Sequence, residues 1–522
     1  MEMNSSCSNQ LPRSHIHNFS TFNARKILND VTSFGSRTAG SIANEVYTRE
    51  YILQKLNEIK SSASSAMEIQ LSEQLSNISS FRSHNHVTTY TNLLNLVLRI
   101  HDKRVTSPLN HALLVNCHYD TPVNTPGASD VFISCAVMIE TARVLASGQF
   151  SLHHDIIMLF NGAEESILPA SHAFVEQHPW SRDAIAFINL EGAGAGGRQV
   201  VFQTGPGSSC QIFMNAFTRS AQNPLANVIG EELFQSGIIP ADTDFRIFRD
   251  YGHIPGIDMA YISDGYAYHT EHDVASRVSD DCIALAGNNL VDLVIELVNS
   301  ADFDSIPRLP HLNTLPTDVY NSDFSIEQPI PHFIEPDRNP QIDASQRYIY
   351  FDYLGLFIVY YPLWFNNVLV YLSLFLIVLF VKRNHRRDVS HWKAVLFATV
   401  IHLICFLLMF AFTVALGFFN HLTGLRLSWY SARWNILIVY LLPMTCFYIF
   451  LSTKVFAIRD RYLTNIFIHL VFLFSYLSGI IVKSTVQEMP IKILIAIFKI
   501  GKILTKVNQN DFFRFLQFHT IH

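Results

Sequence analysis

Residues 111–120 read His-Ala-Leu-Leu-Val-Asn-Cys-His-Tyr-Asp, an apolar stretch that ends in polar side chains. Apolar stretches at 92–100, 155–160 and 184–190 have the length of buried strands, and a helical pattern covers 133–145. Strands that alternate with helices at this spacing indicate an α/β fold with an at least partly parallel sheet. In such sheets ligands gather at the carboxyl ends of the strands. The polar residues that follow these stretches are therefore candidate site residues.

Three of the expected strands end in side chains that can bind metal, in the motifs CHYD (117–120), NGAEE (161–165) and NLE (189–191). GASD (127–130) precedes a helix, and YHT (268–270) lies in a late loop. Two imidazoles and three carboxylates suffice for two zinc ions, with one carboxylate shared and a histidine plus a carboxylate completing each ion. They belong to His118, His269, Asp130, Glu165 and Glu191. Glu164, beside a ligand, is then free to act as a general base.

Each motif alone has an ordinary structural explanation. A histidine two residues before an aspartate is a weak metal signal, and a Glu-Glu pair is usually a solvated surface. Asp130 is also a suitable helix N-cap, His269 is compatible with a surface loop, and His272 is expected to be a surface-loop histidine. The metal interpretation rests on the joint order of the motifs at successive strand ends.

The same motifs resemble those of the co-catalytic zinc aminopeptidase and carboxypeptidase family, and in particular its endoplasmic reticulum metallopeptidase branch. This resemblance implies a zinc-exopeptidase-like mixed sheet flanked by helices, followed by a multi-span α-helical membrane region. The supporting phrases are GSRTAGSIAN (35–44), CAVMIE (135–140), FNGAEESILPASHAF (160–174), FQTGPG (202–207), DTDFRIFRDYGHIPGIDMAYI (242–262) and YFDYLGLF (350–357).

The resemblance also implies roles. Asp130 would bridge two zinc ions, His118 and Glu191 would bind separate ions, and Glu165 and His269 would complete the set, one on each ion.

Asp120 would orient the His118 ring, as such sites require. Glu164 would take a proton from the metal-bridging water and pass it to the leaving amine. Relatives usually have Ser at Ala241 and a polar or acidic residue at Val131. These departures bear on pocket shape and substrate preference rather than on metal binding.

Charge and cysteine content exclude other classes. The net charge is −6, and no Lys/Arg-rich block with interleaved aromatic residues suggests nucleic-acid binding. The seven cysteines are scattered without a CxxC pair, which predicts neither a disulfide scaffold nor a cysteine-type zinc site.

The chain is expected to comprise five segments. Before the membrane region lie a polar N-terminal segment (1–20), a zinc peptidase domain (21–302) that begins with two helices up to residue 60, and a Pro-rich linker or extension (303–363). Apolar runs at 364–381, 394–419, 434–451 and 463–482 predict about four membrane helices within 364–482. The tail, 483–522, contains a weaker run at 491–504 that we expect to be interfacial.

Basic residues predict the orientation in the membrane. The loop 382–393 carries five Lys and Arg side chains and is expected in the cytosol, which places the peptidase domain in the lumen of the endoplasmic reticulum. Sequons at Asn4, Asn18 and Asn77 lie on the same side and are candidate glycosylation sites. Because the first thirty residues contain no signal or anchor, we expect the chain to lack its natural beginning.

Three functions fit these observations. The favoured one is a membrane-anchored exopeptidase that hydrolyses terminal peptide bonds of a peptide substrate. A single-zinc glutaminyl cyclase and a non-catalytic membrane scaffold with the same fold are the alternatives, and the full ligand set with Glu164 favours an enzyme. The sequence does not indicate the oligomeric state or which peptide end is recognised.

Overall fold

The structure is a computed structural model. It describes residues 18–83, 86–105, 111–205, 207–235, 242–306, 347–353, 355–384, 389–424 and parts of 439–447. The chain forms two compact units, Met1–Trp364 with Gly417–Tyr440, and Phe365–Leu416 with Leu441–His522.

The first unit is built on an eight-stranded mixed sheet with the order β1-β4-β6-β5-β7-β10-β8-β9. The four central strands β6, β5, β7 and β10 are parallel, whereas β4 and β8 pair antiparallel with this central group. This arrangement confirms the predicted mixed, partly parallel sheet. The strands are β1 (Met67–Leu75), β4 (Leu94–Asp102), β5 (Ala112–His118), β6 (Asp155–Asn161), β7 (Ala184–Gly192), β8 (Gly196–Gly205), β9 (Leu225–Ala226) and β10 (Gly256–Ser263).

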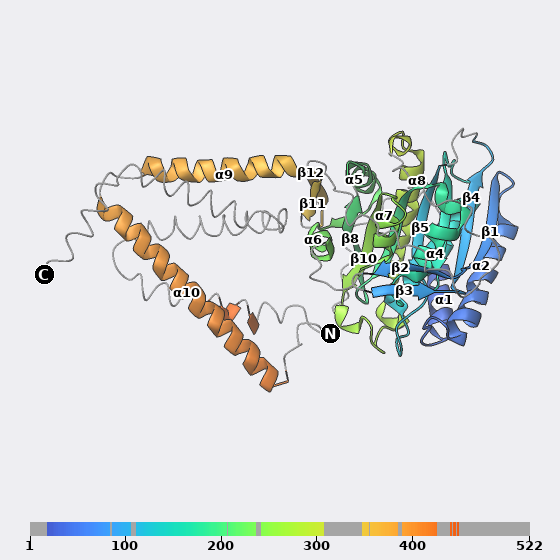
Figure 1. Ribbon diagram of the computed structural model, residues 1–522, viewed down its shortest axis with the longest axis horizontal. Coiled ribbons are helices and arrows are strands. Elements are labelled where there is room, and N and C mark those ends of the chain that lie inside the picture. The colour runs from blue at the N-terminus through green and yellow to red at the C-terminus, as the bar shows by residue number, and fades with distance from the viewer. Residues whose placement is uncertain are drawn as a thin grey trace, which may run out of the picture. The chain divides into compact units, whose positions relative to one another are not determined.

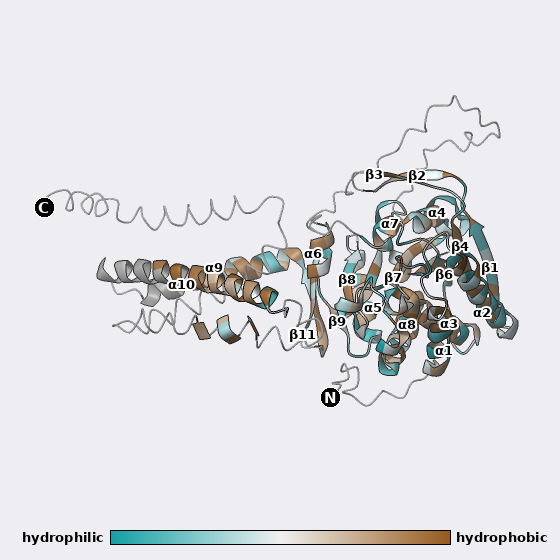
Figure 2. Ribbon diagram, turned by 90° about the horizontal axis from the view of Figure 1, so that it is seen from below, coloured by the Kyte–Doolittle hydropathy of each residue, from teal (hydrophilic) through white to brown (hydrophobic). Residues whose placement is uncertain are grey.

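Helices cover both faces of the sheet (Figure 1). In Figure 2, α4 (Pro169–Gln177) and α7 (Asp244–Asp250) lie on one face, and α1, α3, α5 and α8 lie on the other. The remaining helices of this unit are α1 (Thr21–Thr32), α2 (Arg49–Ser62), α3 (Ile133–Ala146), α5 (Ser209–Ser220), α6 (Ile229–Gln235) and α8 (Asp280–Asn299). Short helical turns are η1 (Ala43–Thr48), η2 (Ala128–Phe132), η3 (Pro179–Arg182), η4 (Gly265–Ala267), η5 (Ala275–Arg277) and η6 (Phe303–Ser305).

Local sequence explains the main elements. All seven residues of β5 are buried, as expected for a central parallel strand covered on both faces. The long helix α8 begins at Ser279, whose hydroxyl accepts a hydrogen bond from the Cys282 amide, and Asp280 and Asp281 follow in the first turn. Both features stabilise a helix N-terminus.

Strand register gives the sheet two distinct edges. The parallel neighbours β5 and β6 pair Ala112 with Asp155 at their start and His118 with Asn161 at their end. Residues that follow these strands therefore gather at one edge, and residues that precede them gather at the opposite edge.

Two hairpins and a disulfide complete the described part of this unit. The hairpins are β2 (Ser79–Ser83) with β3 (His86–Tyr90) and β11 (Tyr348–Tyr353) with β12 (Phe357–Pro362). The second hairpin forms the described end of the segment expected to be a linker, whose residues 307–346 lie outside the described part. The disulfide joins Cys117 to Cys135, a pairing that the sequence had not predicted.

Two long helices follow the hairpin. They are α9 (Leu363–Asn384) and α10 (Val389–Leu422), at the places of the first two expected membrane runs. Brown, hydrophobic residues predominate along their coloured parts in Figure 2. Within the described residues one segment, Ile404–Leu422, is long and apolar enough to cross a membrane. Most of the third expected run and the whole of the later ones lie outside the described part.

Candidate active site

The structure brings the five expected metal ligands together at the carboxyl edge of the sheet. His118 ends β5, Asp130 lies in η2, Glu165 follows β6, Glu191 lies near the end of β7, and His269 follows η4. Nε2 of His118 lies 3.5 Å from Asp130 Oδ1 and 3.6 Å from Glu191 Oε2. Nε2 of His269 lies 2.9 Å from Asp130 Oδ2 and 3.2 Å from Glu165 Oε1.

These distances pair the ligands differently from the expected division. His118 lies next to Glu191, His269 lies next to Glu165, and the two oxygens of Asp130 face the two histidines separately. Two ligand atoms of one tetrahedral zinc ion are about 3.3 Å apart, because the bonds are about 2.0–2.1 Å long. The geometry therefore disagrees with placing His118 and Glu191 on separate ions, while it agrees with Asp130 as the shared carboxylate.

Unsatisfied buried atoms fit a cation at this place. Nε2 of His118, Oδ2 of Asp130 and Oε1 of Glu165 are buried, and none of them has a hydrogen-bond partner of good geometry. The same three residues offer ligand atoms within 4.8 Å of one another. Buried polar atoms normally have partners, and imidazole with carboxylate is a donor set that zinc accepts.

The electrostatics of the cluster favour a positive ion as well. Burial raises the pKa of Glu164 well above its usual range, and burial together with the charge of Asp130 raises the pKa of Glu165 to about 7. Burial lowers the pKa of His269, but the carboxylates of Asp130 and Glu165 outweigh this effect and raise it to about 10. Neighbouring carboxylates thus raise the pKa values of Glu165 and His269, and a bound cation would offset their negative charge.

Asp120 contacts more of the site than the expected His118 ring. Its main-chain oxygen lies 3.2 Å and its Oδ1 lies 3.4 Å from Nδ1 of His118, consistent with the predicted role of orienting the ring. In addition, its carboxylate accepts hydrogen bonds from the amides of Glu164 (2.9 Å) and Glu165 (3.1 Å). One fully buried side chain therefore positions a ligand, the candidate base and the strand end that carries the base.

Asp273, which the sequence analysis missed, holds Asp130 in place. Its carboxylate accepts hydrogen bonds from the amide (2.9 Å) and hydroxyl (2.6 Å) of Ser129 and from the amide of Asp130 (3.1 Å). The signal was its position in the phrase HTEHD, four residues after His269. This loop thus contacts Asp130 twice: His269 lies beside its carboxylate, and Asp273 accepts a hydrogen bond from its amide.

Arg37 is the second missed residue, within the phrase GSRTAG. It is fully buried and donates hydrogen bonds to the carbonyl oxygens of Tyr119 (2.8 Å), Pro126 (2.5 Å) and Gly127 (3.0 Å). Burial lowers its pKa to about 10, so the guanidinium remains charged at neutral pH. It fastens the loop that runs from His118 to Asp130.

The buried side-chain amide of Asn189 positions Glu191. Nδ2 of Asn189 donates to Glu191 Oε1 (3.1 Å) and to Asp258 Oδ1 (3.0 Å), while its Oδ1 accepts from Asn116 (2.7 Å). These hydrogen bonds fix the carboxylate relative to the central strands.

His269 is the ligand most open to solvent. Its side chain is 38% exposed, whereas that of Glu165 is 13% exposed and that of His118 is 1% exposed. The ring stacks on Tyr268 with 3.8 Å between the centroids. This side of the cluster is therefore the accessible one.

The other residues singled out from the sequence are not among the expected metal ligands. Asn18 and Asn77 are exposed, whereas Asn4 and Ala241 are not among the described residues. Val131 is fully buried, and His272 is exposed in its loop, in agreement with the surface interpretation.

The fold and the side chains gathered at its carboxyl edge are those of a metallopeptidase domain. Residues 95–294, which include the five expected ligands, match the model of Peptidase family M28. The chain is similar to endoplasmic reticulum metallopeptidase 1 of Homo sapiens, with 36% identity over 80% of this chain and 42% of the relative, and of Mus musculus, with 33% identity over 94% and 51%. The chain thus spans about half the length of these curated relatives.

Among solved structures, the chain is similar to glutaminyl cyclase of Porphyromonas gingivalis. The identity is 20% and the TM-score is 0.41, over 54% of this chain and 100% of that chain. This similarity does not bear on the chemistry of the site.

Replacing Asp273 by alanine tests its role. We expect zinc affinity to fall about 10–100-fold, because the amides of Ser129 and Asp130 lose their acceptor and the shared carboxylate loses its orientation. Competition with a fluorescent zinc chelator measures the change. Glu271→Ala, an exposed acid in the same loop, is the control and should keep wild-type affinity. Equal affinities of the two variants would show that Asp273 does not position Asp130.

Proposed function

We propose that this chain is a membrane-anchored di-zinc metallo-exopeptidase that hydrolyses terminal bonds of peptides. The observation that carries the proposal is the convergence of His118, Asp130, Glu165, Glu191 and His269 on one buried place. The match of residues 95–294 to Peptidase family M28 and the names of the metallopeptidase relatives support it.

The pairing of the side chains suggests how two ions would be held. His118, Glu191 and one oxygen of Asp130 would hold the first ion, and His269, Glu165 and the other oxygen of Asp130 would hold the second. When bound, such a pair of ions activates a water molecule near neutral pH and polarises the scissile carbonyl.

Glu164 is the group we assign to proton transfer. It is 9% exposed, its Oε2 lies 3.9 Å from Nε2 of His118, and its amide is held by Asp120. The pairing above uses it for neither ion, so its carboxylate stays available to accept a proton from the attacking water and to deliver it to the leaving amine. Burial raises the pKa of this carboxyl, which makes its carboxylate a stronger proton acceptor.

The exposure of the two histidines indicates from which side a substrate approaches the site. The cluster is closed on the side of His118 and open on the side of His269. A peptide end that enters beside the Tyr268–His269 stack would reach Glu165 and Asp130 first. Insertion of one terminus, rather than passage of a long chain, agrees with an exopeptidase.

We further propose that the domain faces the lumen of the endoplasmic reticulum and that the chain is a multi-pass membrane protein. The names of the relatives point to that organelle. The Cys117–Cys135 disulfide fits an oxidising compartment. The helices α9 and α10 and the basic loop 382–393 fit a membrane region that begins after the hairpin.

The variant Glu164→Gln tests the assigned base. Because the amide cannot accept the proton, peptide hydrolysis should fall by about 10²–10⁴-fold, while zinc content stays that of the wild type. Rates on a library of short peptides and metal analysis of the same sample measure both. Glu50→Gln, an exposed substitution on α2, should leave both unchanged. Full activity of Glu164→Gln would refute the assignment, and an inactive wild type would favour the non-catalytic scaffold.

The number of ions is tested through the shared carboxylate. Asp130→Ala should carry two zinc ions fewer than the wild type, because each ion loses the ligand that both have in common. Chelation with 1,10-phenanthroline should abolish hydrolysis, and added zinc should restore it. A difference of one ion, together with cyclisation of a peptide with N-terminal Gln, would instead identify a glutaminyl cyclase.

Orientation in the membrane is tested with Asn18 and Asn77, which are exposed on the domain surface. In microsomes we expect a glycosidase-sensitive gel shift that is reduced in Asn77→Gln and abolished when Asn4 and Asn18 are replaced as well. The domain should also be protected from added protease until detergent is present. Digestion of the domain in intact microsomes would contradict the lumenal placement.

A further inference from the structure

A second group of metal-competent side chains lies at the opposite edge of the sheet. His111 immediately precedes β5, His154 immediately precedes β6, and Asp304 lies in η6 after the last helix of the domain. His118 ends the strand that His111 precedes, so about 23 Å of extended chain separate the two edges, at about 3.3 Å per residue. The group is therefore separate from the candidate active site.

Parallel pairing explains why the two histidines meet. Ala112 is paired with Asp155, so the residues just before them stand side by side, and the Asp155 amide donates to the His111 carbonyl oxygen. The two rings stack with 6.0 Å between their centroids. Phe303, which is fully buried, packs on the ring of His154 at 4.8 Å and so anchors the turn that carries Asp304.

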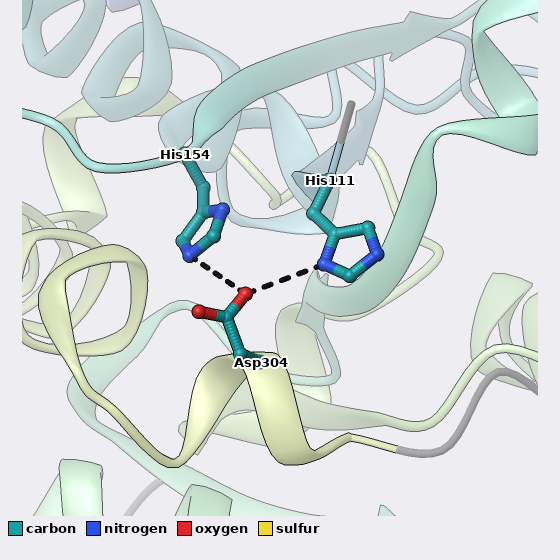
Figure 3. A group of neighbouring side chains, drawn as sticks. All are labelled: His111, His154 and Asp304. Atoms are coloured by element: carbon teal, nitrogen blue, oxygen red, sulfur yellow. Dashed lines mark ion pairs between the residues drawn. The ribbon is translucent and has the colours of Figure 1, made fainter. Parts of the chain in front are cut away.

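The three side chains converge on one oxygen (Figure 3). Nδ1 of His111 lies 3.4 Å and Nε2 of His154 lies 3.3 Å from Oδ1 of Asp304. A charge-assisted hydrogen bond between nitrogen and carboxylate is shorter, about 2.7–2.9 Å. Ligand atoms at two corners of a zinc tetrahedron are about 3.3–3.4 Å apart. Both nitrogen–oxygen distances therefore match those of ligands around an ion, and the three ligand atoms lie within 4.8 Å of one another.

Burial supports the same conclusion. The side chains of His111 and His154 are 10% and 6% exposed, and Nδ1 of His111 is buried without a hydrogen-bond partner although it points to Asp304. An unpaired buried group costs about 1–3 kcal/mol. Asp304 is 53% exposed, which leaves the group open to solvent on one side, where an ion can enter.

We propose that His111, His154 and Asp304 form a second, structural binding site for a divalent transition metal of the zinc type. Two imidazoles and a carboxylate are ligands that zinc accepts, and the exposed side leaves a position for water. The ion ties η6, the last described element before residues 307–346, to the starts of two central strands. It fastens the end of the peptidase domain to its sheet.

The experiment counts zinc in the full chain, purified in detergent and dialysed against a buffer that holds free zinc at a fixed low concentration. The background is Asp130→Ala, so that the ions of the candidate active site do not contribute. One zinc ion per chain is expected in this background. Adding Asp304→Asn or His154→Asn should lower the content to near zero.

Matched controls lie beside the proposed ligands. His153→Asn and Asp302→Asn alter exposed neighbours in the sequence and should keep the ion. Asp304→Asn is isosteric at a half-exposed position, so the fold is retained, and X-ray absorption at the zinc edge should report two imidazole ligands in the background protein.

The two proposals fail separately. Equal zinc contents in the ligand variants and their controls would overturn the structural site. The count of ions at the candidate active site would then stand unchanged, because it is measured by the difference between wild type and Asp130→Ala.

Discussion

The burial of several carboxylates around two imidazoles is the constraint on which the site depends. Asp130, Glu164 and Glu191 are each less than a tenth exposed and lie within 4 Å of the His118 or His269 rings. Like charges held in a medium of low polarity are costly unless an ion or protons compensate them. The buried cation of this region, Arg37, bonds three carbonyl oxygens of a loop rather than these carboxylates. A bound metal ion would compensate the negative charge of these buried carboxylates.

Parallel strands explain why metal-competent groups collect at two edges. β5 and β6 run in register, so both their ends and their starts lie side by side. At the ends, His118 and the residues after Asn161 form part of the candidate active site. At the starts, His111 and His154 meet Asp304. At the edge with the candidate active site, long loops supply further candidate ligands. At the opposite edge, a short turn supplies one carboxylate, Asp304. The smaller group suits a structural ion better than a catalytic one.

How much the sequence could predict depended on the range of each interaction. His118, Glu165 and Glu191 follow strands, and strand patterns are local, so their convergence was predictable from parallel topology. Asp130 and His269 lie in loops that no strand pattern places, and they were named only because the motifs GASD and YHT supply metal-competent side chains. Asp273 and Arg37, which position the site loops, were not predictable in this way. Each forms hydrogen bonds with residues more than 80 positions away in the chain.

The proposed division of these side chains between two ions could not be predicted from the sequence for another reason. It depends on which carboxylate oxygens lie beside which histidine, and these distances follow from the folded loops rather than from strand patterns. The Cys117–Cys135 pair and the hairpin β11–β12 were missed as well, since neither follows from periodicity or from a cysteine spacing.

The loop from His118 to Asp130 links these separate features. Its two flanks are joined by the disulfide between Cys117 and Cys135, which are 18 residues apart. Arg37 donates hydrogen bonds to carbonyl oxygens near both ends of the loop, at Tyr119 and Gly127, and Asp273 accepts hydrogen bonds from the amides of Ser129 and Asp130. His118 and Asp130, the proposed shared ligand, lie at the two ends of this loop. The distance between them is therefore set by contacts that involve no metal. The site is thus preorganised by the chain itself, and bound ions would satisfy a geometry that already exists.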